Sequence, residues 1–251
     1  MPDENKLWNS TSNIFVAFLD IMGFEDRVFR EKHEDVKIMF ESLRPAIKEI
    51  EKEAEKKLQE QLNLNKKGDD SPLVFPVSFS DSIILFTSDD KEDSADRIII
   101  DAVYVLSQAI ENGIPMKGAI AFGEMTVDTT NSLYFGKPII DAYKLHQELQ
   151  IYGVILHHTA QKRISELNDT KIITNAFTYD YAVPMKSGKV NHRFVDWTFF
   201  CDNPLNSVEK LYNTVSGSPR VYVDNTLEFV RWVMQKKTEL DQLKKTKEKP
   251  V

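Results

Sequence analysis

The sequence has little of several features that define particular protein classes. Its 251 residues include one cysteine, Cys201, which excludes a disulfide framework and a zinc site built from cysteines. No apolar run approaches the roughly eighteen residues that a membrane-spanning helix needs. The N-terminus also lacks the charged-then-apolar pattern of a signal peptide. We therefore expect a soluble, cytoplasmic protein with no membrane partner.

Positive charge is also in short supply. Lys and Arg total 32 against 39 Asp and Glu, which gives a formal net charge of −7. Because sequence-independent binding to nucleic acid needs a basic surface, we expect no nucleic-acid partner. A hydrophobic content of 41% with 28% charged residues is ordinary for a globular chain, and the length allows one or two domains.

The hydrophobic pattern predicts strands that alternate with helices. Short apolar runs predict strands at residues 14–19, 74–79 and 82–87, the last two joined as a hairpin. From residue 25 the spacing changes to three and four, which predicts a long helix that Pro45 either kinks or divides. Further helices are predicted at residues 93–112, 139–149, 207–215 and 226–237. Further strands are predicted at residues 116–122, 124–128, 153–157, 171–174 and 193–199, the first two as a hairpin around Gly123.

This order of elements predicts an α+β fold. Hairpin-paired strands with helices between them favour a ferredoxin-like, split βαβ arrangement, an antiparallel-rich sheet covered by helices. We divide the chain into an N-terminal extension (residues 1–13), one main domain (14–235) and a basic C-terminal tail (236–251). A helical arm near residues 48–65 belongs to the main domain.

Two aspartates are the best candidates for chemistry. Asp20 ends the first strand at a strand-to-helix turn, and Asp81 lies in the first hairpin. In a split βαβ sheet these two strand ends are neighbours, so the carboxylates can converge. Paired carboxylates suit Mg²⁺ or Mn²⁺ when the phosphates of a nucleotide supply further oxygen ligands. On residue type alone, a helix cap at Asp20 and an ordinary turn at Asp81 remain open.

Four segments resemble the class III nucleotidyl cyclases, and they follow the order found in that family. One is the Asp-Ile-Met-Gly-Phe of residues 20–24, and another is the hairpin at residues 78–82, with Ser80 where glycine is usual. The others are the Lys-Gly-Ala-Ile strand within residues 116–123 and the glycine-led helix at 136–145. Together they cover roughly residues 14–158. They are most similar to the pyrimidine cyclases of bacterial Pycsar anti-phage systems.

The resemblance implies a reaction and a cofactor. A nucleoside triphosphate is cyclised, pyrophosphate leaves, and two Mn²⁺ or Mg²⁺ ions are held by Asp20, Asp81 and the carbonyl of Ile21. Residues 14–235 then form the catalytic domain. Backbone N–H groups at the start of the next helix are implied to bind phosphate, namely those of Met22, Gly23 and Phe24.

Three further positions bear on the resemblance: one agrees with the family pattern and two depart from it. Lys117 matches the basic residue that reaches the triphosphate in the family, although a solvated strand lysine explains it equally well. Where many members carry Asn and Arg to support the transition state, this chain has Ile140 and Lys144. Ile140 cannot donate a hydrogen bond, and Lys144 keeps the positive charge without the two-pronged geometry of arginine.

The positions that read the base in purine cyclases are apolar in this chain. Val77 and Leu133 cannot hydrogen-bond to a purine edge, which favours a pyrimidine substrate. We expect UTP because the resemblance includes uridylate cyclases, and CTP remains the alternative. Other candidates for the base pocket are Phe75, Phe79 and Tyr134, for which core packing is the competing explanation.

The resemblance also implies partners. Class III cyclases build their sites across a two-fold dimer, so a homodimer with sites at the subunit interface is expected. The cyclic product is expected to act on a separate effector in phage defence. Two alternatives stay open. One is a cyclase-like module that binds nucleotide or dimerises without catalysis, and the other is a palm-like phosphotransferase.

Overall fold

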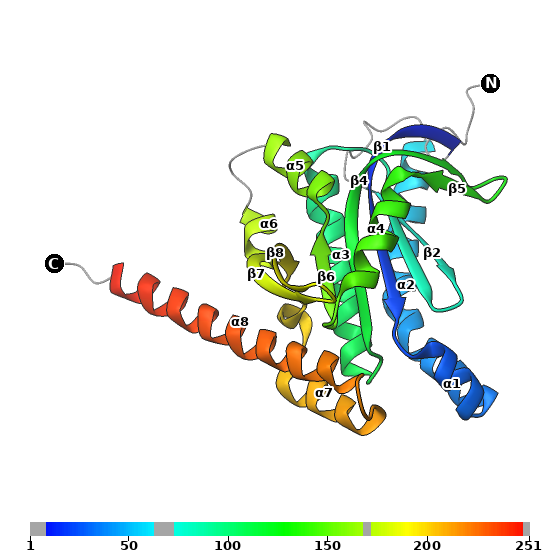
Figure 1. Cartoon of the computed structure of the whole chain (residues 1–251). Coiled ribbons are helices and arrows are strands. Elements are labelled where there is room, and N and C mark those ends of the chain that lie inside the picture. Colours follow the sequence, from blue (N-terminus) through cyan, green and yellow to red (C-terminus); the bar gives the residue numbers. More distant parts are fainter. Residues whose placement is uncertain (1–8, 63–72, 168–171, 248–251) are drawn as a thin grey trace.

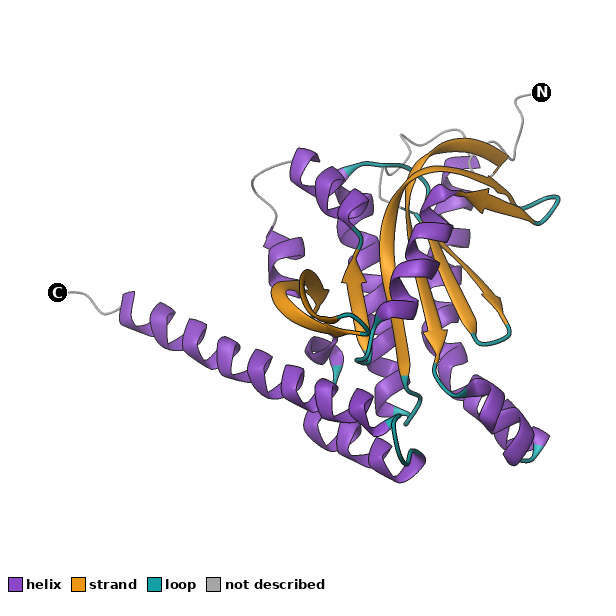
Figure 2. Cartoon of the chain, in the orientation of Figure 1, coloured by secondary structure: helices purple, strands orange, loops and turns teal. Residues whose placement is uncertain are grey.

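One large sheet with helices on both faces organises the molecule (Figure 1). The computed structural model describes residues 9–62, 73–167 and 172–247. The order of the strands across the sheet is β2-β3-β1-β4-β6-β8-β7, and β5 pairs with the far end of β4. The pairing of β4 with β6 is parallel and the other pairings are antiparallel (Figure 2).

The strands and helices follow one another along the chain with short connections. The strands are β1 (Asn9–Ile21), β2 (Val74–Phe79), β3 (Ser82–Thr87), β4 (Met116–Asp128), β5 (Leu133–Gly136), β6 (Gly153–Leu156), β7 (Thr178–Met185) and β8 (Gly188–Val195). The α-helices are α1 (Phe24–Arg30), α2 (His33–Leu62), α3 (Glu92–Glu111), α4 (Lys137–Glu148), α5 (His158–Leu167), α6 (Ile172–Phe177), α7 (Pro204–Lys210) and α8 (Arg220–Lys247). Two 3₁₀ helices are η1 (Trp197–Phe200) and η2 (Leu211–Thr214). Among the described helices, none has the length and apolar character that crossing a bilayer requires.

The alternation of side chains along β1 determines what each face of the sheet contacts. Phe15 and Leu19 are fully buried in the main core, to which residues of α3 also belong. In Figure 1, α3 lies behind the sheet. Val16 belongs to a second, smaller cluster, and Phe18 contacts the rings of Tyr143 and His146 on α4. Asp20 follows Val16 and Phe18 at the same two-residue spacing, so its side chain lies on the face of the sheet that α4 covers.

The predicted hairpin around Gly123 is wrong. β4 continues through Gly123, which pairs with Ile14, and β1 and β4 stay in register from Asn9↔Asp128 to Ile21↔Met116. The reversal of the chain comes later, where β5 folds back so that Gly136 lies opposite Met125. A long partner strand supplies hydrogen bonds on both sides of the glycine, and this outweighs the local tendency of glycine to turn.

The sequence-based prediction also fails in the C-terminal third. Residues 172–174 begin α6 instead of a strand, and Lys171 lies outside the described residues. The strand predicted at 193–199 ends at Val195, because Asp196 accepts the N–H of Thr198 at 3.0 Å and starts η1. Strand β7 was not predicted at all.

Three predicted boundaries shift. Residues 9–13, assigned to an N-terminal extension, form the start of β1. Helix α2 runs without interruption through Pro45 to Leu62, so no second helix begins at that proline, and residues 63–65 of the predicted arm lie outside the described residues. Helix α8 begins at Arg220 and continues beyond residue 236 to Lys247, so most of the predicted tail is helical.

The contact of Lys237 with Asp196 anchors α8 and gives a test of this docking. The ammonium nitrogen lies 2.7 Å from the fully buried carboxylate and donates to the Thr198 hydroxyl at 3.0 Å. We expect Lys237→Met to lower the free energy of unfolding by about 2 kcal/mol, because it removes the counter-ion of a buried charge. Urea unfolding measures the loss. Lys236→Met is the control, since its pair with Glu239 is exposed and contributes little. Equal stability of the two variants contradicts the prediction.

Candidate active site

Asp20 lies at the end of β1 between two neighbouring strands. Its register partners are Ser82 on β3 and Lys117 on β4. The Ser82 hydroxyl donates a hydrogen bond to Asp20 Oδ1 at 3.4 Å, and Nε2 of His146 on α4 lies 3.8 Å from Oδ2. The carboxylate is therefore enclosed by β3, β4 and α4, with its side chain 23% exposed.

The structure brings Asp81 to the same cavity. Asp81 lies in the turn between β2 and β3, and its backbone carbonyl accepts the N–H of Ile21 at 2.9 Å, which ties this turn to the end of β1. Both carboxylates line one cavity of about 620 Å³. The turn requires a left-handed backbone at Ser80, with φ of 54°, a conformation that glycine adopts without steric cost.

The two carboxylates repel one another in a partly buried setting. Burial and, to a smaller extent, the negative charge of Asp81 raise the pKa of Asp20 to about 6, while Lys117 and the hydrogen bond from Ser82 act in the opposite direction. A bound cation relieves such repulsion. The described residues contain no cluster of three or more His, Cys, Asp or Glu side chains able to hold a metal. Two carboxylates and the Ile21 carbonyl are hard oxygen donors, so this set fits Mg²⁺ or Mn²⁺, with water or the phosphates of a ligand completing the coordination.

Lys117 is buried beside Asp20, with 5% of its surface exposed. Its ammonium donates to the carbonyl of Leu149 at 3.4 Å and lies 5.5 Å from the centre of the Tyr222 ring. Burial lowers the pKa of Lys117 to about 8, although the charge of Asp20 raises it. The alternative of a solvated strand lysine is therefore wrong, and the side chain is held with its charge toward the cavity.

Sequence reasoning missed several residues at this cavity, among them His146, Lys186 and Tyr222. Burial lowers the pKa of His146 to about 4, with Lys117 adding to the effect, so the ring is neutral at pH 7. Its Nδ1 has no hydrogen-bond partner among the described residues. Lys186 follows β7, and its N–H donates to the carbonyl of Glu148 at 2.8 Å. No local signal identified Lys186, because the β7–β8 hairpin that carries it was itself not predicted.

The predicted phosphate-binding turn is only partly available. The N–H of Met22 donates to the carbonyl of Pro115 at 2.8 Å, so the prediction that this donor is free for phosphate is wrong. Gly23 has a left-handed backbone with φ of 72° and precedes the seven-residue helix α1. Phe24 begins α1 and packs edge-on against Phe40. Gly23 and Phe24 both line the cavity around Asp20.

The residues predicted to contact the base, and Lys144, lie away from the cavity around Asp20. The described residues that line this cavity do not include Val77, Phe79, Leu133, Tyr134 or Lys144. Tyr134 stacks on Phe86, with ring centres 5.6 Å apart, and Phe75, Val77 and Tyr134 border the second hydrophobic cluster. The other three side chains are exposed to solvent, namely those of Phe79 (80%), Leu133 (51%) and Lys144.

The raised pKa of Asp20 predicts a pH dependence of stability. Near pH 5 the folded protein holds a proton on Asp20 that the unfolded chain has largely released, so stability falls as pH rises from about 4 to about 6. A shift from 3.8 to about 6 corresponds to at most about 3 kcal/mol. Urea unfolding in EDTA, compared with Asp20→Asn, isolates this contribution because asparagine does not titrate.

Manganese is expected to reverse the loss. Above about pH 6, where Asp20 is ionised, Mn²⁺ should stabilise the wild-type protein and should have little effect on Asp20→Asn. The same urea series with added Mn²⁺ measures this. A difference between wild type and variant that stays constant from about pH 4 to pH 7, with and without Mn²⁺, contradicts the assignment.

Comparison with known proteins supports the fold. No protein-family model and no curated protein matches the sequence. Among solved structures, a bacterial light-regulated adenylyl cyclase aligns over 82% of this chain and 58% of its own, with a TM-score of 0.50 and 11% identity. The catalytic core of a rhodopsin-guanylyl cyclase with converted specificity, in complex with ATPαS, aligns over 74% of this chain and 96% of its own, with a TM-score of 0.50 and 16% identity. The predicted α+β architecture is confirmed, and it is the fold of class III cyclase catalytic domains.

Proposed function

We propose that the protein is a nucleotidyl cyclase that converts UTP to 3′,5′-cyclic UMP and pyrophosphate. The observation that carries the proposal is the convergence of Asp20 and Asp81 with Lys117 on one cavity of a cyclase fold. Carboxylates for cations and a buried ammonium for phosphate are the groups that such a reaction needs.

The reaction forms a bond between the 3′-oxygen and the α-phosphorus and breaks the bond from that phosphorus to the pyrophosphate oxygen. The 3′-hydroxyl proton passes to solvent water. Asp20, Asp81 and the Ile21 carbonyl would hold divalent cations, which would acidify this hydroxyl and offset phosphate charge. Lys117 and Lys186 attract the triphosphate, and the neutral ring of His146 packs beside Asp20 and keeps water from that side of the carboxylate.

The charge of the cavity supports a requirement for cations. Among the described residues that line it, four carry carboxylates (Asp20, Glu25, Asp26 and Asp81) and two are lysines (Lys117 and Lys186). A triphosphate entering without metal meets net negative charge. Cations are thus needed for binding as well as for chemistry.

The base-binding half of the site is proposed to come from a second copy of the chain. Val77, Leu133 and Lys144 do not line the cavity around Asp20 among the described residues, as expected if they serve the partner's site. Exposed apolar side chains on β2, β5 and α4 suit an isologous interface, namely those of Phe79, Leu133, Phe135, Ile140 and Tyr143.

The choice of a pyrimidine rests on the apolar character of Val77 and Leu133. UTP is chosen over CTP because the resemblance includes uridylate cyclases, and CTP is the alternative. Incubation with each common nucleoside triphosphate and Mn²⁺, followed by mass spectrometry, tests it. Cyclic UMP is expected as the main product, and cyclic CMP would move the assignment to cytidylate. Cyclic AMP or GMP as the main product would overturn the pyrimidine proposal, and a linear dinucleotide would indicate a palm-like phosphotransferase.

A second candidate is a cyclase-like module without catalysis. The observation that favours it is Ile140, half exposed on α4 where a hydrogen-bond donor is usual in the resembling family. Absence of product from every triphosphate, in the wild type as in Asp20→Asn, would favour this module. With activity present, we propose that the cyclic product signals to a separate effector in phage defence.

A further inference from the structure

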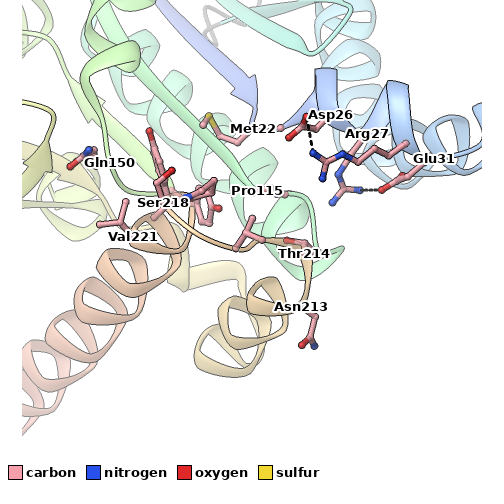
Figure 3. A pocket seen from close by; sticks show the side chains of 16 residues that line it. Met22, Asp26, Arg27, Glu31, Pro115, Gln150, Asn213, Thr214, Ser218 and Val221 are labelled. Atoms are coloured by element: carbon pink, nitrogen blue, oxygen red, sulfur yellow. Dashed lines mark hydrogen bonds and ion pairs between the residues drawn. The ribbon is translucent and has the colours of Figure 1, made fainter.

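A second cavity lies beside the turn from β1 into α1, and residues of that turn line it (Figure 3). It encloses about 740 Å³, inside the range of roughly 300–1,000 Å³ typical of small-molecule sites. Four residues line both this cavity and the one around Asp20, namely Met22, Gly23, Asp26 and Tyr222. The two spaces therefore share a wall, and nothing in the proposed cyclisation uses the second one.

The walls come from parts of the chain that are far apart in sequence. Figure 3 shows Asp26 on α1, Ser218 and Val221 where α8 begins, and Pro115 between them. Helix α8 and the preceding loop lie beyond the segments that resemble cyclases. The C-terminal region thus closes a space that the catalytic core leaves open.

The lining is aromatic on one side and polar on the others. Tyr152 stacks on Tyr222, with ring centres 5.7 Å apart and an angle of 20° between the planes. Neutral hydrogen-bonding side chains are those of Gln150, Asn213, Thr214 and Ser218. Arg30 stands at the rim, 76% exposed, and its pair with the equally exposed Asp26 is 3.5 Å long.

These groups suit a planar heterocycle that carries one anionic group. Tyrosine rings and amides accommodate the edges and the apolar body of a base. An exposed ion pair contributes little, so the Arg30 guanidinium can exchange Asp26 for a phosphate at small cost. A nucleoside monophosphate has this combination of a base and one phosphate.

An occupant of this cavity reaches the Asp20 site through Tyr222. The ring of Tyr222 lies under the ammonium of Lys117 at 5.5 Å, and Lys117 is the register partner of Asp20. The turn at Met22 is the second connection, since its N–H is held by the carbonyl of Pro115 in the shared wall. Displacing either group moves a cation or a backbone segment that faces the carboxylates.

We propose that this cavity is a regulatory site for a nucleoside monophosphate, open or 3′,5′-cyclic, which acts on the Asp20 site through Tyr222. The regulatory effect of the nucleotide rests on the proposed cyclase function, whereas its binding to this cavity does not. The two parts are therefore tested separately.

Binding is measured by calorimetry with UMP and with cyclic UMP, in EDTA, on the Asp20→Asn/Asp81→Asn double variant. Saturable binding, equal to that of the wild type, is expected because the second cavity is intact. Ser218→Trp fills the cavity and should weaken binding at least about tenfold, and Thr214→Trp should do the same. Ser216→Trp, on the same loop but not lining the cavity, should bind normally. No binding to the wild type, or equal binding by Ser218→Trp and Ser216→Trp, overturns the proposal.

Regulation is measured as the effect of UMP on UTP turnover. In the wild type, UMP should change kcat and not only KM, and Ser218→Trp should be insensitive to it. A purely competitive effect that persists in Ser218→Trp places UMP in the catalytic cavity and overturns the regulatory role. If the wild type turns over none of the common nucleoside triphosphates, the cyclase proposal has failed, and the calorimetry still decides the site.

Discussion

Asp20→Asn and Asp81→Asn are each expected to lower UTP turnover at least about a thousandfold, equivalent to about 4 kcal/mol of transition-state stabilisation. Each variant removes one of the two charged oxygen donors that face the cavity, and an amide binds divalent cations far more weakly than a carboxylate. Quantifying cyclic UMP by mass spectrometry, at saturating UTP and Mn²⁺, measures the loss. Activity within about tenfold of wild type in either variant would contradict the assignment.

Glu25→Gln provides the matched control. Glu25 lines the same cavity but is exposed in the first turn of α1, so its replacement should change turnover by less than about threefold. Loss of fold is excluded by thermal melting. Asp20→Asn should melt no lower than wild type in EDTA at pH 7, because burial and Asp81 penalise the ionised Asp20 carboxylate.

Gly118→Ala is expected to cause a large loss of stability. A Cβ atom at Gly118 would collide with the carbonyl oxygen of Phe18 and would lie only 2.6 Å from Cδ2 of Leu19. The first of these contacts is with backbone, so β1 itself has to move away from β4. We expect a loss of about 3 kcal/mol and a melting temperature lower by about 6–12 °C. Differential scanning calorimetry in EDTA measures both.

Gly113→Ala separates this close approach from backbone strain. Gly113 has φ of 72°, but no described atom lies within 4 Å of the position that a Cβ would take. Its replacement should cost only about 1 kcal/mol, the price of a left-handed alanine. Similar losses in the two variants would show that the strand contact at Gly118 tolerates a methyl group.

The sequence by itself was sufficient for the parts of the site that depend on local pattern. Strands β2 and β3 begin and end at the predicted residues, because β-forming runs flank a turn in which Ser80 and Asp81 are the central residues. The change from a strand to a helical period after Asp20 likewise marks the end of β1. Periods of two and of 3.6 residues are properties of short segments and can be read without knowledge of distant neighbours.

The tertiary structure decided what depends on partners distant in sequence. Gly123 remains within a strand because β1 is long enough to pair on both sides of it. Lys117 is buried because Tyr222, about a hundred positions later, covers it. His146 and Lys186 reach the cavity only through the packing of α4 and the β7–β8 hairpin. Periodicity shows which face of a helix or strand is buried, but it does not show which other element packs on that face. The carboxylate pair was therefore predictable from the sequence, and the residues around it were not.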